Sequence, residues 1–438
     1  MTSSLKIAYY GDDFTGATDT LATAARAGLR TLLFLGLPSA AQLERAGPLD
    51  CLGIAGAARA MTPAEMQTEL APVGRLFAQL GAPVMHYKTC STFDSAPHVG
   101  SIGTAIRVLQ PFAGNAFVPI VGGQPNLRRY CVFGNLFASA GPSMHRIDRH
   151  PTMRRHPVTP MQEADLRLHL AQQGLQLASV DYPDYQQSES ALDQQLSAVI
   201  SQQPDAVLLD IAQAEDLAIV GRLIWQSACR QPLLAAGPSS VVQALAAHWQ
   251  VQAPQTLPAH DTIAPAPGPV LVLAGSLSPM TARQIKAASS YEQLLLDAPR
   301  LAQDIAYRLQ MAKDIALRLR QGINMLACTS SEGQIAAADA PADARALALA
   351  CGELLAQVLK LAPIRRLGVA GGDTSSHALR ELHVQALTTL LPLPQTPGSP
   401  LCTAHGTYAA TNGLQIALKG GQVGSDGYFA QIRDGLQG

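Results

Sequence analysis

The chain has 438 residues, a length that favours two or three domains. Hydrophobic residues make up 47% of the sequence and charged residues only 14%, and this composition excludes an intrinsically disordered chain. The formal net charge is −1. Such a balance provides no field to attract DNA, RNA or an anionic membrane, so we expect neither nucleic acid nor a membrane as a partner.

The seven cysteines lie singly, without any Cys-x-x-Cys pair. This pattern indicates neither a disulfide framework nor a structural zinc site, and we expect no metal held by side chains of the protein alone. The N-terminus leads directly into an apolar strand, and no apolar run reaches the roughly 18 residues of a membrane span. We therefore expect a cytoplasmic protein.

Short apolar runs alternate with helical stretches along the whole chain, which is the pattern of α/β proteins with parallel sheets. In the first half, the sequence predicts strands at 5–10, 30–35, 51–55, 84–87 and 207–211, and helices at 18–27 and 239–249. In the second half, it predicts strands at 270–275, 323–329, 367–370 and 414–419, and helices at 279–288, 301–320, 342–361 and 376–383.

Five prolines separate these two halves, all between His248 and Val270. Prolines at this density cannot continue a helix or occupy a central strand. We interpret 250–268 as a linker between a domain over 1–249 and a domain over 269–438. The predicted fold class is α/β, with two domains that each have a mainly parallel sheet flanked by helices.

A pair of carboxylates, Asp12 and Asp13, directly follows the first predicted strand in the run Gly-Asp-Asp-Phe-Thr-Gly at 11–16. A kinase needs one carboxylate that accepts the proton of the attacking hydroxyl, and a strand end is a suitable place for it. Either aspartate could instead cap the helix that follows. Both interpretations remain open from the residues.

Three turns rich in glycine and hydroxyl groups follow predicted strands in the second half, at 275–279, 371–376 and 419–425. Backbone amides in such turns can bind phosphate, especially where a helix begins. Each turn alone is explained equally well by tight turns or helix caps. Together they favour an anionic ligand such as a nucleotide, although the chain lacks both the P-loop and the Gly-x-Gly-x-x-Gly motifs.

Two other groups of polar residues lie in the first half. Arg59 and the stretch 86–95 follow short strands, and an arginine can hold a carboxylate bidentately while lysine and hydroxyls bind a polyol acid. Ordinary surface charge is the alternative. The basic segment 145–157 could bind a phosphate or carboxylate, or it could form a solvated loop.

Taken together, these motifs resemble the four-carbon acid sugar kinases, formerly a family of unknown function. The likeness runs in order through seven segments that span almost the whole chain: 11–19, Arg59, 88–92, 156–159, 275–281, 371–376 and 419–425.

The resemblance implies an N-terminal domain that binds the sugar acid and a C-terminal domain that binds ATP with Mg²⁺. It implies contacts to the substrate from Asp12, Arg59, Lys88, Ser91 and Thr92. It implies contacts to ATP from Ser276, Gly371, Gly372, Asp373, Thr374, Gly420 and Gly421. Because the two ligands fall on different domains, we expect the active site in the interdomain cleft. We expect Asp12 or Asp13 to be the catalytic base and Arg59 to clamp the substrate carboxylate.

Two departures from the family pattern concern the substrate. Many members have Asp-Thr-x-Ser-Arg where this chain has Ala-Gly-Ala-Ala-Arg at 55–59, and Lys-Ile-Asp-Ser-Thr-Leu-Arg-Gly where it has Lys-Thr-Cys-Ser-Thr-Phe-Asp-Ser at 88–95. The altered pattern looks like that of the branch that phosphorylates 3-oxo-isoapionate. A threonate or erythronate is the alternative substrate.

Two other functions compete with a kinase. One is a nucleotide-responsive binding protein that has lost catalysis, against which the Asp12-Asp13 pair argues. The other is a nicotinamide-dependent dehydrogenase, which would need the glycine fingerprint that this chain lacks. The sequence does not determine the oligomeric state, and a homodimer is one alternative.

Overall fold

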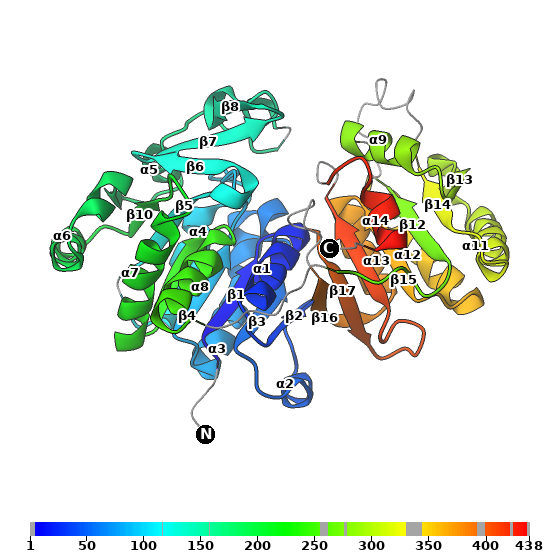
Figure 1. Cartoon of the computed structure of the whole chain (residues 1–438), viewed down its shortest axis with the longest axis horizontal. Coiled ribbons are helices and arrows are strands. Elements are labelled where there is room, and N and C mark those ends of the chain that lie inside the picture. Colours follow the sequence, from blue (N-terminus) through cyan, green and yellow to red (C-terminus); the bar gives the residue numbers. More distant parts are fainter. Residues whose placement is uncertain are drawn as a thin grey trace. The chain divides into compact units, whose positions relative to one another are not determined.

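The computed structural model describes residues 5–115, 117–156, 158–254, 262–275, 278–329, 344–391, 399–420 and 424–435. The chain divides into two compact units, Met1–Pro258 and Ala259–Gly438, and each is an α/β unit built on a mostly parallel sheet (Figure 1). All seven cysteines are free thiols. Among the described residues, no helix is both long and apolar enough to cross a membrane.

The first unit contains a parallel sheet of eight strands. In spatial order these are β2 (Thr31–Phe34), β3 (Cys51–Ala55), β1 (Ile7–Gly11), β4 (Val84–Lys88), β11 (Leu233–Gly237), β5 (Pro119–Gln124), β10 (Ala206–Asp210) and β9 (Leu177–Val180). Strands such as β1 and β10 are buried along their whole length. Strands covered on both faces read as continuous apolar runs, which is why the sequence reveals them.

The helices of the first unit are α1 (Phe14–Arg26), α2 (Ala40–Ala46), α3 (Pro63–Leu80), α4 (Ile102–Leu109), α5 (Leu166–Ala171), α6 (Glu189–Ser201), α7 (Asp216–Arg230) and α8 (Ser240–Gln252). Helix α8 packs against both α1 and α7, and α3 packs against α4. Because crossovers between parallel strands are right-handed as a rule, this strand order assigns the two groups to opposite faces of the sheet. The loops that connect each strand to the next helix start at the carboxyl edge of the sheet, which is where open sheets bind ligands.

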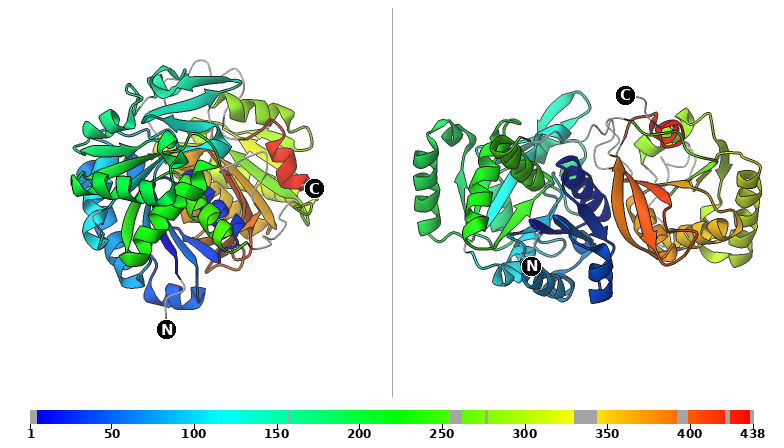
Figure 2. Two further views of the ribbon diagram at one scale, coloured as in Figure 1. Left: turned by 60° about the vertical axis from the view of Figure 1, so that its left-hand side comes forward. Right: turned by 60° about the horizontal axis from the view of Figure 1, so that its bottom comes forward.

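An antiparallel extension continues from β5, formed by β6 (Arg129–Val132), β7 (Asn135–Ala140) and β8 (Ser143–Arg146). It is drawn in cyan in Figures 1 and 2. The loop between β6 and β7 is Phe133-Gly134, both with positive φ, as a two-residue hairpin of the primed type requires. The carboxylate of Asp210 accepts from both amides of this loop (2.7 and 3.1 Å).

The second unit has a seven-stranded sheet whose last two strands are antiparallel. In spatial order its strands are β13 (Glu292–Leu295), β14 (Met325–Cys328), β12 (Val270–Ala274), β15 (Arg366–Ala370), β18 (Gln415–Lys419), β17 (Leu401–Gly406) and β16 (Val384–Leu391). Its helices are α9 (Pro279–Ala287), α10 (Ala298–Gln303), α11 (Ile305–Arg320), α12 (Ala344–Leu361), α13 (Gly372–Glu381) and α14 (Tyr428–Asp434).

The structure corrects the predicted elements in three places. The helix predicted over 301–320 is two helices, because Asp304 has an extended backbone and caps α11 by accepting from the amide of Tyr307 (3.0 Å). Helix α8 continues to Gln252, past the predicted start of the linker. Within that predicted linker, the described residue Ile263 is buried in the core of the second unit, so the packed structure of this unit begins before Val270.

Candidate active site

The carboxyl ends of three neighbouring strands in the first unit hold the predicted acid-binding residues. Gly11 at the end of β1 is in register with Ala55 at the end of β3 and with Lys88 at the end of β4. The amide of Asp12 donates to the carbonyl of Lys88, and the amide of Arg59 donates to the carbonyl of Asp12 (both 3.0 Å). The structure therefore brings Asp12, Arg59 and Lys88 together.

Asp13 caps helix α1. Its Oδ1 accepts a hydrogen bond from the amide of Gly16 (2.9 Å), which satisfies one of the unpaired amides of the first turn. The same oxygen lies 3.0 Å from Nη2 of Arg59 and 3.9 Å from Nζ of Lys88. Asp13 is thus both a helix cap and a member of the charged cluster formed by Asp12, Asp13, Arg59 and Lys88.

Arg59 holds the carboxylate of Asp12 through one edge of its guanidinium. Nε donates to Oδ2 (3.2 Å) and Nη2 donates to Oδ1 (2.9 Å), a bidentate geometry that suits a planar guanidinium. Only 6% of the Asp12 side chain is exposed. A substrate carboxylate bound bidentately at this edge would have to displace Asp12. The geometry therefore favours Arg59 as the residue that positions Asp12.

Lys88 is a buried cation without an ordinary hydrogen bond. Its Nζ lies 3.9 Å from Asp13, beyond hydrogen-bond distance, and no other described atom accepts from it. A Cβ added to Gly16 would lie 1.8 Å from this Nζ, so a larger residue at this position would displace the ammonium. Three donors without an acceptor suit an anionic or hydroxylated ligand.

The pKa values of the two carboxyl groups in the charged cluster are shifted in opposite directions. Burial raises the pKa of Asp12, and the charges of Arg59 and Lys88 oppose only part of this shift. Burial acts on Asp13 in the same direction, but Arg59 and Lys88 outweigh it and hold the pKa of Asp13 below its usual value. Adjacent acids whose pKa values diverge serve different roles. Asp12 is the stronger proton acceptor of the two.

The loop after β4 folds back on its own side chains. Oγ1 of Thr92 donates to Asp94 (2.5 Å) and lies 2.9 Å from Sγ of Cys90. Phe93 has a φ of 54°, which is uncommon for a bulky residue and marks a segment held in shape by its surroundings. Ser91 and Thr92 are both buried. The predicted residues of this loop thus lie in a constrained turn at the end of β4.

Sequence reasoning missed a polar network beside this edge. Oδ2 of Asp19 on α1 accepts from the hydroxyl of Ser239 (2.5 Å) and from the side-chain amide of Gln124 (3.2 Å). Gln124 ends β5 and Ser239 precedes α8. Asp19 and Ser239 are 220 positions apart. No local pattern joins residues so distant in sequence, and only the sheet order does.

In the second unit, the predicted phosphate turns follow three adjacent strands. Strands β12, β15 and β18 end in register at Ala274, Ala370 and Lys419. The amide of Gly275 donates to the carbonyl of Ala370, and the amide of Gly371 donates to that of Lys419 (both 2.9 Å). The three turns lie far apart in the sequence, but they therefore begin side by side at one edge of the sheet.

Two of these turns begin at a glycine that a larger residue could not replace without a shift, one for its backbone conformation and one for its packing. Gly371 precedes α13 with a φ of 127°, a conformation that glycine adopts readily and other residues avoid. A Cβ added to Gly275 would lie 2.3 Å from Oγ1 of Thr374. Such close backbone approach at the start of a helix is typical of anion sites. Ser276, Gly421 and the side chain of Asp373 lie outside the described residues.

Lys419 opens the third predicted turn, but the sequence analysis gave its side chain no role. Its Nζ donates to Oγ1 of Thr281 (2.9 Å), in the first turn of α9, which Ser278 caps. Burial lowers the pKa of Lys419 to about 7. Lys419 thus ties the end of β18, just before Gly420, to the helix that follows the first phosphate turn.

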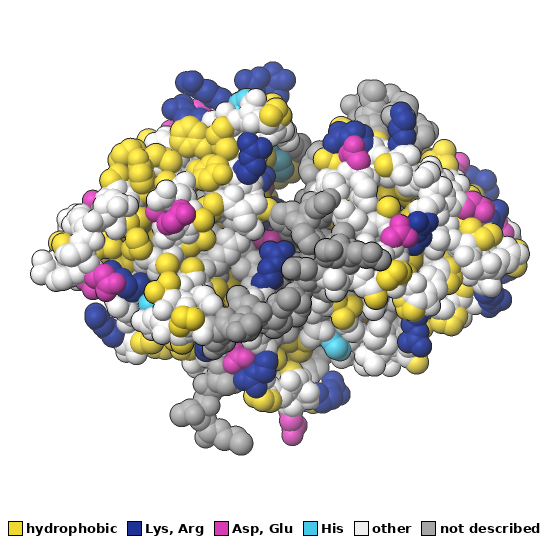
Figure 3. All heavy atoms as spheres, in the orientation of Figure 1, with side chains coloured by type: hydrophobic (Ala, Val, Ile, Leu, Met, Phe, Trp, Pro, Cys, Tyr) yellow, Lys and Arg dark blue, Asp and Glu magenta, His cyan; other side chains and the backbone are white. Residues whose placement is uncertain are grey.

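The basic segment 145–157 lies apart from the charged cluster. Arg146 pairs with Asp148 (2.6 Å), and Arg154 and Arg155 are exposed. Figure 3 shows Lys and Arg side chains gathered over the end of the first unit that carries β7 and β8. No hydrogen bond or ion pair between described residues links this segment to the charged cluster. The described part of the segment contains two short 3₁₀ helices, Ile147–Arg149 and Met153–Arg155, and both interpretations of it stay open.

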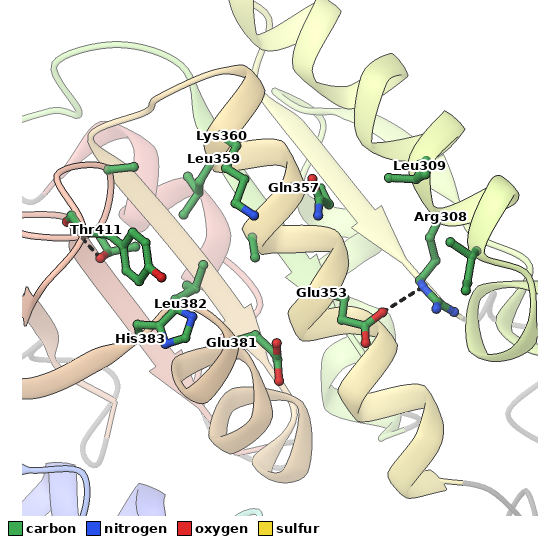
Figure 4. A pocket seen from close by; sticks show the side chains of 14 residues that line it. Arg308, Leu309, Glu353, Gln357, Leu359, Lys360, Glu381, Leu382, His383 and Thr411 are labelled. Atoms are coloured by element: carbon green, nitrogen blue, oxygen red, sulfur yellow. Dashed lines mark hydrogen bonds and ion pairs between the residues drawn. The ribbon is translucent and has the colours of Figure 1, made fainter.

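A cavity of about 240 Å³ in the second unit lies among α11, α12 and the C-terminal end of α13 (Figure 4). Arg308 and Glu353 form an ion pair on one side of it (3.1 Å), and the rings of His383 and Tyr408 meet on the other, 4.6 Å apart. Helix α13 spans about 15 Å between this cavity and the phosphate turn at its start. None of the predicted site residues lines the cavity.

Two family models match the two units. The model described as a sugar-binding N-terminal domain matches residues 7–245, and the one described as a nucleotide-binding C-terminal domain matches residues 271–429. The chain belongs to the four-carbon acid sugar kinase family. It is 39% identical to a 3-oxo-isoapionate kinase of Paraburkholderia graminis, over 99% of this chain and 95% of the relative. It is 29% identical to a 3-oxo-tetronate kinase of Methylobacterium radiotolerans, over 98% of this chain and 99% of the relative.

Two solved structures share the fold over nearly the whole chain. A Salmonella typhimurium LT2 protein superposes with a TM-score of 0.80 at 24% identity and covers 98% of each chain. A Haemophilus influenzae protein superposes with a TM-score of 0.75 at 22% identity, over 97% of this chain and 98% of its own. At this identity the likeness establishes the α/β fold of the family.

Proposed function

We propose that this chain is an acid sugar kinase that transfers the γ-phosphoryl group of ATP to a hydroxyl of a small acid sugar. The observation that carries the proposal is the charged cluster in the unit that matches the sugar-binding family model. There a buried aspartate with a raised pKa lies beside Arg59 and Lys88. The relatives of known activity that match along the whole chain are kinases of such acids.

The proposed reaction needs one proton acceptor and several positioned charges, because phosphoryl transfer leaves the protein little covalent work. As the substrate hydroxyl attacks the γ-phosphorus, Asp12 takes its proton, and the bond to the β-phosphate oxygen breaks to release ADP. Arg59 keeps Asp12 in place, and Lys88 holds the substrate through an oxygen. Ser91 and Thr92 remain predicted substrate contacts in the loop after β4.

In the second unit, the turns that begin at Gly275, Gly371 and Gly420 would receive the phosphates of ATP. Across the described residues, no group of three or more acidic, histidine or cysteine side chains is arranged to hold a metal. Mg²⁺ at kinase sites is held mainly by phosphates with one or two carboxylates, so the phosphates of ATP would supply most of its ligands here. When bound with ATP, Mg²⁺ neutralises charge on the transferred group.

For the substrate, we favour 3-oxo-isoapionate. The support is the higher identity to the kinase of that acid, 39% against 29% for the 3-oxo-tetronate kinase, together with the altered residues at 55–59 and 88–95. 3-Oxo-tetronate is the second candidate, and the threonates and erythronates follow. A position of the active site in a cleft between the domains remains a prediction, as does a homodimer.

An ADP-release assay with Mg-ATP and a panel of these acids tests the proposal. The expected result is ADP formation that depends on the acid and is fastest with 3-oxo-isoapionate. If ATP binds but no acid in the panel releases ADP, the kinase assignment is wrong and the nucleotide-responsive binding protein takes its place.

A further inference from the structure

Arg129 lies at the same sheet edge as the charged cluster. It opens β6 and pairs in register with Gln124, the last residue of β5. Strand β11 lies between β5 and β4, which ends at Lys88. Because the carboxyl ends of parallel strands share one edge, Arg129 and Lys88 stand at that edge on either side of β11. The sequence analysis did not select Arg129.

One edge of the Arg129 guanidinium has no acceptor among the described residues. Nη1 donates to the carbonyl of Leu127. Nε is buried without a hydrogen-bond partner, and no described residue accepts from Nη2 or forms an ion pair with the guanidinium. In Arg59, the corresponding edge, formed by Nε and Nη2, holds the carboxylate of Asp12. A buried donor left unpaired is costly, so such an edge in a folded protein calls for an explanation.

The surroundings of Arg129 connect it with the predicted substrate loop. Burial lowers the pKa of Arg129, while the charges of Cys90 and Asp19 act in the opposite direction. Cys90 acts in the same way on Arg59, so both arginines lie within electrostatic range of this one residue. Oδ2 of Asp19 already accepts from Ser239 and Gln124, and Asp19 forms no ion pair with Arg129. Arg129 therefore stands at the same sheet edge as the substrate loop, and its Nε–Nη2 edge has no acceptor among the described residues.

We propose that the Nε–Nη2 edge of Arg129 binds the carboxylate of the acid sugar. Asp12, positioned by Arg59, then takes the proton of the hydroxyl at the other end of the same substrate. This inference rests on the proposed function and assigns the carboxylate contact to a residue other than Arg59. It makes Arg129 the residue that distinguishes an acid from the corresponding uncharged polyol.

The test compares each acid with the polyol made by reducing its carboxylate. We expect R129Q to lower kcat/KM for the acid at least about tenfold, mainly through KM, because a charge-assisted bidentate contact is lost. For the polyol, kcat/KM of R129Q should equal that of the parent. R129K should also lose preference for the acid, because lysine keeps the charge but lacks the fork. The matched control is R128Q, since Arg128 is exposed and donates only to the carbonyls of Gly141 and Pro142.

Each outcome decides the question. An unchanged preference for the acid in R129Q overturns the proposal, and equal losses with acid and polyol show a merely structural arginine and overturn it as well. If the parent phosphorylates no acid, the proposed function fails. In that case, calorimetry with the acid tests the role of Arg129 separately. Weaker binding by R129Q than by the parent supports the carboxylate contact, and equal affinity contradicts it.

Discussion

Asp12 and Asp13 are neighbours in sequence but are held differently, so their variants should differ. Asp12→Asn removes the proton acceptor and should cut turnover at least about 10²-fold. Asp13→Asn keeps a side chain that caps helices as well as aspartate does, and should cost far less. ATP affinity, measured by calorimetry, should be unchanged in both. Full activity of the Asp12 variant, or a larger loss in the Asp13 variant, would contradict the assignment of the base.

Arg59 should set the pH dependence of the reaction. Asp12 must be ionised to accept a proton, so kcat/KM falls as the pH falls through its pKa. Arg59 lowers that pKa, so Arg59→Gln should move the acidic limb of the pH profile to higher pH. Arg30→Gln is the control, because Arg30 makes the same bidentate pair with Asp50 at the surface. A limb that stays in place or moves down would refute the role of Arg59.

Lys419 should make stability depend on pH. Burial lowers its pKa to about 7, whereas an unfolded lysine titrates near 10.4. Between these values the unfolded chain binds more protons, so the free energy of unfolding rises with pH. Lys419→Met lacks this contribution. Its stability relative to the parent should be highest near pH 7 and fall by a few kcal/mol, roughly, towards pH 10. Denaturant titrations that show a constant difference would contradict the burial of a titrating amine.

Gly275 allows the first phosphate turn to lie against α13. Gly275→Ala places a Cβ 2.3 Å from Oγ1 of Thr374, so the turn must shift and ATP binding should weaken by about tenfold or more. Gly427→Ala is the matched control in the same unit, since its Cβ meets nothing within 4 Å and its φ is −80°. Acid binding should be unaffected in both variants. Equal ATP affinity of the Gly275 variant and the control would exclude this turn from the nucleotide site.

The sequence predicts several of the buried parallel strands closely, but it misses β5 and β11, which are buried along their whole length. The run at 51–55 matches β3 in full, and 84–87 misses only Lys88 of β4. The extension β6–β8 was not predicted, because its strands are only partly buried and short. The break between α10 and α11 was missed as well. Asp304 is an unremarkable residue in an amphipathic run, and only its capping bond to Tyr307 reveals it.

The candidate site was predictable where its residues directly follow strands. Asp12 and Lys88 stand at strand ends, and local pattern therefore places them at the same edge. The pairing of Arg59 with Asp12 was not predictable, since it depends on the three-residue 3₁₀ helix Ala58–Ala60 that turns Arg59 back towards β1. Arg129 was missed because nothing in its local sequence indicates an arginine whose Nε is buried without a partner.

At the scale of the whole molecule, we expect one unit to bind the acid and the other to bind ATP. Residues 7–245 match the sugar-binding family model and residues 271–429 match the nucleotide-binding one. The variants above should follow this division: changes at Asp12 spare ATP binding, and changes at Gly275 spare acid binding. A variant in one unit that abolished binding of both ligands would contradict the division.

The central claim is that a phosphoryl group passes from ATP to the acid with Asp12 as the base. Mass spectrometry of 3-oxo-isoapionate incubated with Mg-ATP and the full chain tests it most directly. The account predicts a product heavier by one phosphoryl group in the parent reaction, and at least about 100-fold less of it with Asp12→Asn. Unmodified acid in the parent reaction, or the same yield of product from both proteins, would contradict it.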